Sequence, residues 1–301
     1  MSYQEKKLAS KDGYQLALRI YDTTAPKAVV KCIHGMEEYQ DRYMFFAEFL
    51  QEAGYTVVTA DLRGHGISAP RLSHIADREG HLRLLEDEET ILNFIHVQWP
   101  GVPVVLFGQS MGSIIARVVL QKYSREFHKV VLSGYPNPNG AAGFGIALTE
   151  VLASLKGAGG YSRLLDGMAL GPFSKAVPEA KTPQDWLSVN PENVKRYIAD
   201  PLCGARFTIG SYNALFRLIR MMDSPELYEE VWKELPILMI SGAEDPCTGG
   251  EKGRADSENR LRRAGFRDLE IITLSGMRHE ILNETGREEV CRIILEFLDK
   301  A

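Results

Sequence analysis

Short apolar runs alternate with longer amphipathic segments along most of the chain. The short runs are bounded by glycine, proline or polar turns and predict β-strands at residues 28–33, 56–60, 102–107, 130–133, 236–240 and 269–274. The longer segments carry apolar residues three and four positions apart and predict helices at residues 42–53, 82–99, 111–123, 254–264 and 287–298. Strands that alternate with helices over short connections predict an α/β fold, in which helices cover both faces of a mostly parallel sheet.

Turn residues support several of these boundaries. Two more strands are predicted at residues 6–9 and 14–21, and Asp12-Gly13 between them is a common hairpin turn. Gly54 follows the first predicted helix and Pro100-Gly101 follows the second, and both are typical signals of a helix C-terminus. A hairpin therefore precedes the α/β segment.

The alternation breaks at Tyr135-Pro136-Asn137-Pro138-Asn139-Gly140 and returns near residue 224. Between these points the chain has glycine-rich and apolar stretches, scattered prolines and mainly helical periodicity. We therefore predict a core domain formed by residues 1–136 and 224–301, and a helical cap, or lid, formed by residues 137–223. The cap is expected over the carboxyl edge of the sheet, where open α/β folds bind ligands.

Composition and charge narrow the classes of function. The 301 residues are 45% hydrophobic and 25% charged, which is ordinary for a soluble globular enzyme. The formal net charge is -5 and the lysines and arginines form no dense run, so no nucleic-acid partner is expected. The acidic run from Glu86 to Glu89 predicts a solvated helix face rather than a metal site, because consecutive carboxylates spread around a helix.

Cysteine spacing and hydropathy bear on the cellular compartment. The four cysteines are widely spaced and form no C-x-x-C pair, which indicates neither a zinc site nor a disulfide framework: Cys32, Cys203, Cys247 and Cys291. The N-terminal residues lack the apolar core of a signal peptide, and no stretch resembles a membrane span. We therefore expect a cytoplasmic protein.

The segment Gly108-Gln109-Ser110-Met111-Gly112 joins the strand predicted at 102–107 to the helix predicted at 111–123. The pattern G-x-S-x-G between a strand and a helix is typical of a nucleophile elbow, a strained turn that lifts the serine hydroxyl clear of the sheet. The residues two before and two after the serine must be small, which explains both glycines. Ser110 is therefore the candidate nucleophile.

A serine nucleophile needs a histidine to take its proton and an acid to orient that histidine. Asp245 follows the strand predicted at 236–240, and His279 follows the strand predicted at 269–274. With Ser110 they occur in the chain order Ser, Asp, His, each in the loop after a core strand, which is the order of α/β-hydrolases. The three residues are therefore expected at one edge of the sheet as a catalytic triad.

Rival residues exist for the acid and for the base. Glu244 is the rival acid, because adjacent side chains on an extended segment point to opposite sides and only one can face His279. Pro246 favours Asp245, because it holds the residue before it in an extended conformation. The other histidines are expected to be loop or surface residues: His34, His65, His74, His81, His96 and His128.

Acyl transfer also needs backbone N–H donors for the developing oxyanion. One is expected from Met111, directly after the nucleophile, and one from Met36 in the loop after the third strand, although His34-Gly35 in that loop can also be read as a simple tight turn. The pattern Gly64-His65-Gly66-Ile67-Ser68-Ala69 resembles a dinucleotide fingerprint. It does not open a helix and Pro70 interrupts it, so we interpret it as a turn-rich loop and expect no cofactor and no metal.

Several separated segments together resemble the monoacylglycerol lipase and lysophospholipase branch of the α/β-hydrolase superfamily. Besides the elbow and the loops of Asp245 and His279, they are residues 34–43, 61–68 and 199–203. The resemblance implies an α/β-hydrolase fold with a cap formed by the insertion. It also implies a triad of Ser110, Asp245 and His279 and an oxyanion hole formed by Met36 and Met111.

The resemblance extends to the substrate, with two departures. It implies that Glu38 and Arg42 hydrogen-bond a polar head group, whereas their spacing alone fits a surface ion pair equally well. Gln109 stands where these lipases usually have histidine, and Leu282 stands where they can carry a second histidine near the glycerol. Cys247, close to the acid, resembles a cysteine of some relatives and is expected to be a partly buried, inert thiol.

The sequence thus predicts a cofactor-independent serine hydrolase that cleaves a small-molecule or lipid ester with an apolar acyl chain, such as a monoacylglycerol or lysophospholipid. Apolar cap residues would line or gate an acyl tunnel, or else pack the cap's own core: Phe144, Ile146, Leu148, Val151, Leu152 and Leu155. The same cap predicts transient contact with a membrane surface. The alternatives are a peptidase or amidase, which would need an acidic cluster near the pocket that is not evident in the sequence, and a ligand-binding protein without catalysis.

Overall fold

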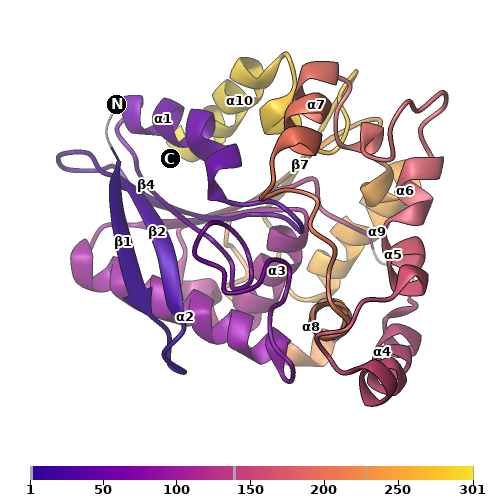
Figure 1. Ribbon diagram of the computed structural model, residues 1–301. Coiled ribbons are helices and arrows are strands. Elements are labelled where there is room, and N and C mark those ends of the chain that lie inside the picture. Colours follow the sequence, from indigo (N-terminus) through magenta and orange to yellow (C-terminus); the bar gives the residue numbers. More distant parts are fainter. Residues whose placement is uncertain (1–2, 138–139, 229, 301) are drawn as a thin grey trace.

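The computed structural model describes residues 3–137, 140–228 and 230–300. Its strands are β1 (Gln4–Ala9), β2 (Gln15–Tyr21), β3 (Val29–Ile33), β4 (Thr56–Ala60), β5 (Val104–Gln109), β6 (Lys129–Ser133), β7 (Ile237–Gly242) and β8 (Leu269–Leu274). They form one eight-stranded sheet in the order β1-β2-β4-β3-β5-β6-β7-β8 (Figure 1). The pairs β1–β2 and β2–β4 are antiparallel and all other neighbours are parallel. The predicted α/β fold with a mostly parallel sheet is confirmed.

Helices cover both faces of this sheet (Figure 1). Those outside the segment between β6 and β7 are α1 (Met44–Glu52), α2 (Gly80–Gln98), α3 (Met111–Tyr123), α9 (Gly250–Arg263) and α10 (Arg287–Asp299). One apolar core contains α1, α10 and strand residues such as Val30 and Val105, and the other contains α2, α3, α9 and strand residues such as Val29 and Val104. Adjacent strand side chains point to opposite faces, so the buried strands supply both cores.

Most predicted elements are present, with shifts at their ends. The bounds of β4, α3 and β8 are those predicted. Strand β5 begins later than predicted because Pro103 has no N–H to give to a sheet, although its carbonyl accepts from Val29 at 2.8 Å; it ends at Gln109 rather than Phe107. A short 3-10 helix, η1 (Gln40–Tyr43), precedes α1.

Between β6 and β7 all regular elements of the described residues are helical, as predicted. They are α4 (Ala142–Lys156), α5 (Arg163–Ala169), α6 (Gly171–Lys175), η3 (Asp185–Leu187), α7 (Pro191–Ala199), α8 (Ile209–Met222) and η4 (Pro225–Leu227). Figure 1 shows α4, α5 and α6 grouped at one side of the molecule, while α8 packs against α4 and also against α2 and α3. The division into core and cap at residues 137 and 223 stays a prediction, and Pro138 and Asn139 near its start lie outside the described residues.

The prediction that Glu86 to Glu89 form a solvated helix face is wrong for the two middle residues. Asp87 is 1% exposed and Glu88 is 3% exposed. Glu88 forms an ion pair with Lys31 of β3, which is equally buried, and Asp87 forms one with Arg63 at 2.8 Å. The carboxylates are buried because cations from distant parts of the chain meet them, which local periodicity does not reveal.

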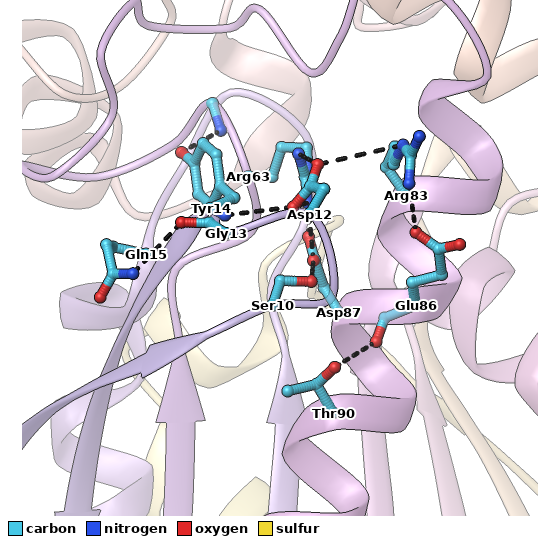
Figure 2. A network of polar contacts seen from close by, with 11 residues as sticks. Ser10, Asp12, Gly13, Tyr14, Gln15, Arg63, Arg83, Glu86, Asp87 and Thr90 are labelled. Carbon is cyan, nitrogen blue, oxygen red and sulfur yellow. Dashed lines mark hydrogen bonds and ion pairs between the residues drawn. The ribbon is translucent and has the colours of Figure 1, made fainter.

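Arg63 is the centre of a polar network at the end of the hairpin (Figure 2). Its guanidinium donates to both carboxylate oxygens of Asp87 on α2, at 2.8 and 2.9 Å, and to both of Asp12 in the β1–β2 turn, at 2.8 and 3.1 Å. The Tyr14 ring lies 4.4 Å from the guanidinium, and its hydroxyl accepts from the Gly64 N–H at 3.0 Å. The network fixes the start of the loop after β4 against the hairpin and α2.

Candidate active site

Ser110 lies in the turn between β5 and α3 and has φ 52° and ψ -120°. A non-glycine residue at positive φ is strained, and such strain is typical of a nucleophile elbow. A Cβ on Gly108 would lie 2.5 Å from the Gly112 carbonyl oxygen, and a Cβ on Gly112 would lie 2.2 Å from the Ile33 carbonyl oxygen. The predicted need for small residues on both sides of the serine is confirmed.

His279 and Asp245 form a buried hydrogen-bonded pair at the same sheet edge. Nδ1 of His279 and Oδ2 of Asp245 are 2.9 Å apart, in the loops after β8 and β7. The Asp245 carboxylate also accepts from the Cys247 N–H at 2.9 Å, whereas the rival Glu244 is exposed. His279 and Ser110 line one cavity, so the structure brings the three predicted residues together.

The pKa of His279 is raised well above its usual value. Burial by itself would lower this pKa, since it removes water from the charged imidazolium. The adjacent Asp245 carboxylate outweighs burial through its charge and its hydrogen bond. The Cys247 thiol also faces the imidazole, but burial raises the pKa of Cys247 to about 11, so the thiol is uncharged near neutral pH and Asp245 carries the shift.

The loop after β3 brings Met36 close to Ser110. A Cβ on Gly35 would lie 3.2 Å from the Ser110 Cβ, so the loop passes close to the elbow. The Gly35 N–H donates to Glu38 Oε1 at 2.5 Å, which fixes the shape of the loop. Met36 and Met111 both line the cavity that contains Ser110.

His34 and His65 are buried rings beside this loop. His34 Nε2 accepts from the Leu62 N–H at 2.8 Å, so its Nδ1 carries the proton and donates to the Gly35 carbonyl at 2.7 Å. The two imidazoles are 5.1 Å apart. Burial lowers the pKa of both histidines, to about 4 for His65. These neutral rings join the loops after β3 and β4, which fits the expectation that they are loop residues rather than bases, although neither is on the surface.

The cavity beside Ser110 has a volume of about 440 Å³ and a mainly apolar wall. This wall comes from α5, α6 and α8 and the residue between the first two: Met168, Leu170, Phe173, Leu215, Phe216 and Ile219. Among the described residues, none of the six apolar cap residues predicted to line or gate a tunnel is one that lines the cavity: Phe144, Ile146, Leu148, Val151, Leu152 and Leu155. Leu148 and Leu152 instead pack against the apolar core that contains α8, which is closer to the alternative that these residues pack a core. From α4, Ala142 lines the cavity, while α8, against which α4 packs, supplies part of the apolar wall.

A buried cluster around Arg42 forms the polar side of the cavity. Arg42 forms ion pairs with Glu280 and, at 3.6 Å, with Glu38, and it donates to Asn193 Oδ1 at 3.0 Å. Its guanidinium lies 5.3 Å from the centre of the Tyr197 ring. Burial and the neighbouring Glu280 raise the pKa of Glu38 to about 7, against the opposing effect of Arg42.

The two head-group residues predicted from the resemblance differ in their access to the cavity. Glu38 lines it, with Tyr197 and Glu280, whereas Arg42 is not among the lining residues in the described parts of the chain. No sequence pattern pointed to Glu280, which comes from the base loop. The contact between Glu280 and Arg42 forms only in the folded chain, where the loop after β8 meets η1.

Comparison with known proteins decides the family. Residues 24–286 match the family described as serine aminopeptidase, S33. The chain belongs to this family.

Its relatives include lipases and an esterase. A monoacylglycerol lipase of Mycolicibacterium smegmatis is 27% identical over 90% of this chain and 89% of its own length. A monoglyceride lipase of Homo sapiens is 29% identical over 79% of this chain and 72% of its own length. The structure of a carboxyl esterase from Bacillus coagulans in complex with glycerol matches with a TM-score of 0.90 at 27% identity, covering 99% of this chain and 98% of that one. These findings confirm the resemblance and place this S33 family member among the carboxylic ester hydrolases.

Gln109 and Leu282, the two positions singled out in the sequence, have defined places in this S33 family member. Gln109 is buried at the end of β5, and its Nε2 donates to the main-chain oxygen of His279 at 3.0 Å. Leu282 lies in the short helix η6 (Ile281–Asn283), where it is buried in the core on the α10 face and does not line the cavity. The polar side of the cavity is therefore built without this position.

The residues around His279 also include a group of possible metal ligands. In the described ranges, one group of three side chains brings metal-ligating atoms within 4.8 Å of one another: Asp245, Cys247 and His279. It contains the Asp–His pair, so a metal there would displace the hydrogen bond between Asp245 and His279.

The glycine pattern at residues 64–69 lies in the loop between β4 and α2 and opens no helix, which confirms its interpretation as a turn-rich loop.

Proposed function

We propose that the protein is a serine esterase in which Ser110 is the nucleophile, His279 the base and Asp245 the acid. The Ser110 hydroxyl attacks the ester carbonyl carbon while His279 Nε2 takes its proton. His279 then gives this proton to the leaving alcohol, which leaves an acyl-enzyme. Water, deprotonated by the same base, releases the carboxylic acid. Asp245 keeps the proton on Nδ1, so that Nε2 is available, and stabilises the imidazolium.

The oxyanion is proposed to bind the N–H groups of Met36 and Met111. Met111 is the first residue of α3, and the first N–H groups of a helix have no acceptor within the helix and favour negative charge. Met36 belongs to the loop that Glu38 holds through Gly35. A donor of this kind typically lowers the barrier by about 3 kcal/mol.

The proposed substrate has one apolar acyl chain and a neutral polar head, as in a monoacylglycerol. The mainly apolar wall suits the chain, and Glu38, Tyr197 and Glu280 offer polar contacts. No lysine or arginine lines the cavity in the described parts of the chain, so an anionic head group would lack a cation there. We propose that Glu38 contacts the head group directly and that Arg42 acts through Glu38 and Glu280. A lysophospholipid is the second ester in this proposal.

The observation that carries the proposal is the His279–Asp245 hydrogen bond in a cavity shared with a strained serine. The test is a panel of esters that varies acyl length against head group, measured on the wild type and on Ser110→Ala. We expect monoacylglycerols to be hydrolysed faster than lysophospholipids and the Ser110→Ala variant to be inactive on both. Equal activity of the variant, or no hydrolysis of any ester by the wild type, would contradict the proposal.

A peptidase or amidase is the second candidate, and one observation favours it. Three carboxyl side chains line the cavity, although the sequence showed no acidic cluster: Glu37, Glu38 and Glu280. Carboxylates can bind the amine of a peptide N-terminus, but Arg42 already pairs with two of these three. A higher kcat/KM for aminoacyl amides than for the matching esters would favour the peptidase.

We also propose that the cap, residues 137–223, contacts a membrane surface. No helix in the described ranges is long and apolar enough to cross a bilayer. On α4, however, Phe144 is 64% exposed, Val151 57% and Leu155 75%. An exposed apolar row on one helix is typical of interfacial binding. Sedimentation with neutral lipid vesicles should fall in the double variant Phe144→Ser/Leu155→Ser, and equal sedimentation of variant and wild type would contradict the contact.

A further inference from the structure

The loop that carries the base is bonded to the cap segment at η3. Arg278 Nη1 donates to the carbonyl oxygens of Asp185 and Ser188, at 2.7 and 3.2 Å. The Glu280 N–H donates to the Leu187 carbonyl oxygen at 2.8 Å. The residues before and after the catalytic histidine thus both hold this segment, which fixes the side chain at its centre relative to the imidazole.

That side chain is Trp186, and it packs on the imidazole of His279. The two ring centroids are 4.9 Å apart and the ring planes are tilted by 43°. Trp186 is 9% exposed and lines the same cavity as His279. It also packs against Phe173, at a centroid distance of 5.2 Å. The base therefore has the Asp245 carboxylate at Nδ1 and an aromatic ring beside it.

We propose that Trp186 is a positioning residue for the base, and that its ring stabilises the imidazolium formed when His279 takes the proton of Ser110. The proposal rests on the triad proposed above. A cation within about 6 Å of a tryptophan centroid is attracted to the negative face of the ring, and the attraction is stronger where water is excluded. The cap would thus supply part of the catalytic machinery as well as a wall for the substrate.

A test of this role must separate the effect of Trp186 on His279 from the effects of the other groups around the imidazole. Asp245 and the Cys247 thiol are the titratable groups that face it, and the thiol is uncharged near neutral pH because burial raises the pKa of Cys247 to about 11. The Gln109 amide, which does not titrate, holds the main-chain oxygen of His279. Neither Asp245 nor Gln109 is replaced in the test, so a change in the titration of His279 can be assigned to Trp186.

The direction in which the pKa of His279 moves when Trp186 is replaced distinguishes an electrostatic role of the ring from that of a plain apolar wall. Loss of a plain wall would admit water, favour the imidazolium and move the acid limb of kcat/KM to higher pH. Loss of an aromatic ring that stabilises the imidazolium would instead move the acid limb to lower pH, since His279 would give up its proton more readily. A merely structural defect would lower activity without moving the limb.

The test measures kcat and KM from about pH 5 to about pH 9, a range that spans the ordinary histidine pKa, with a soluble short-chain ester. It compares the wild type with Trp186→Phe, which keeps a weaker aromatic face, and Trp186→Leu, which keeps only apolar bulk. We expect the limb to move down by about one pH unit in the leucine variant and by less in the phenylalanine variant. We also expect kcat to fall about tenfold in the leucine variant, with KM changed less.

Phe173→Leu is the matched control, because it removes the neighbouring ring and leaves Trp186 in place. The acid limb of its kcat/KM profile should stay at the wild-type position.

A limb at or above the wild-type position in Trp186→Leu would overturn the proposal. If that variant does not fold, the folded Trp186→Phe variant decides, and an unchanged limb there overturns it equally. Labelling of Ser110 by a fluorophosphonate is measured in parallel. An unlabelled wild type would mean that the proposed triad itself fails, whereas labelled proteins with unmoved limbs would mean that only the role of Trp186 fails.

Discussion

Gln109 Nε2 donates a hydrogen bond to the main-chain oxygen of His279 at 3.0 Å. The residue before the nucleophile, at the end of β5, therefore holds the base loop at the end of β8, although β6 and β7 lie between these strands in the sheet. The side chain that makes this bond is an amide, which does not titrate. The turn of the proposed nucleophile and the loop of the proposed base are thus joined by a bond that does not change with pH in the range in which histidine titrates.

Replacing Gln109 is expected to lower kcat. Gln109→Ala removes the bond to His279, and Gln109→Glu keeps the size but has no donor when ionised. We expect about a tenfold lower kcat in both variants, equivalent to about 1.4 kcal/mol, with little change in KM. Gln109→His can donate again and should recover part of the rate. A wild-type kcat in Gln109→Ala, which removes the donor at every pH, would show that the bond does not position the base.

The dependence of kcat/KM on pH should reveal the effect of the Asp245 carboxylate on the pKa of His279. Because the pKa of His279 is raised, the wild-type kcat/KM should increase with pH around a midpoint above about 6.5, the usual histidine value. Asp245→Asn removes the negative charge, so the buried imidazole should lose its proton at lower pH and the midpoint should move down. The kcat should also fall about 10⁴-fold, because the amide no longer selects the right tautomer. A midpoint in the variant equal to or above that of the wild type would argue against this pairing.

Gly112→Ala should destabilise the elbow strongly. The new Cβ would lie 2.2 Å from the Ile33 carbonyl oxygen, which is backbone and cannot turn away. We expect a loss of about 3 kcal/mol in the free energy of unfolding, measured by urea titration, with loss of activity. Gly167→Ala in α5 is the control, because nothing lies within 4 Å of its Cβ position. Equal unfolding midpoints for the two variants would contradict the steric argument.

Arg42→Ala should weaken the selection of the head group. Without Arg42, Glu38 and Glu280 are left as neighbouring buried carboxyl groups without their cation, and the pKa of Glu38 should rise further. We expect KM for a monoacylglycerol to rise about tenfold, while the preference for acyl length stays the same. The exposed Arg196 on α7 provides the control substitution to alanine. An unchanged head-group preference in Arg42→Ala would remove this cluster from the substrate site.

The ion pair of Lys31 and Glu88 should matter for stability rather than for activity. Burial lowers the pKa of Lys31 to about 7, and Glu88→Gln leaves this buried amine without its carboxylate partner, so the free energy of unfolding should fall by about 3 kcal/mol near neutral pH. The double variant Lys31→Met/Glu88→Leu removes both charges and should be close to the wild type. The partly exposed pair of Arg83 and Glu86 is the comparison, and Glu86→Gln should cost less than about 1 kcal/mol. A double variant as unstable as Glu88→Gln would contradict the assignment.

Much of the fold could be predicted because its signals are local. Apolar periodicity located β4, α3 and β8 with the observed bounds. The carboxyl ends of parallel strands meet at one edge, so the chain order alone brought Ser110, Asp245 and His279 together. Of the two adjacent acids, the sequence favoured the one that contacts the imidazole.

The wrong predictions, and the site residues that the sequence did not indicate, all concern contacts between distant elements. The acidic run on α2 was expected in solvent, because nothing in its own sequence indicates that Lys31 and Arg63 meet it in the interior. Six apolar residues of α4 were expected to line or gate a tunnel or else to pack a core, because periodicity gives the apolar face of a helix but not the element it packs against. The apolar wall comes from α5, α6 and α8. Glu280 and Trp186 are recognised as site residues only through their folded partners, Arg42 and His279.

The most direct test of the proposed chemistry is to identify the residue that a fluorophosphonate modifies, because this probe reacts with a serine activated by a base. The wild type, Ser110→Ala and His279→Ala are each treated with the probe and digested, and the labelled peptide is identified by mass spectrometry. We expect a single label on Ser110 in the wild type, no label in Ser110→Ala and a strongly reduced rate of labelling in His279→Ala. A label on another serine of the wild type, or a label that persists in Ser110→Ala, would contradict it.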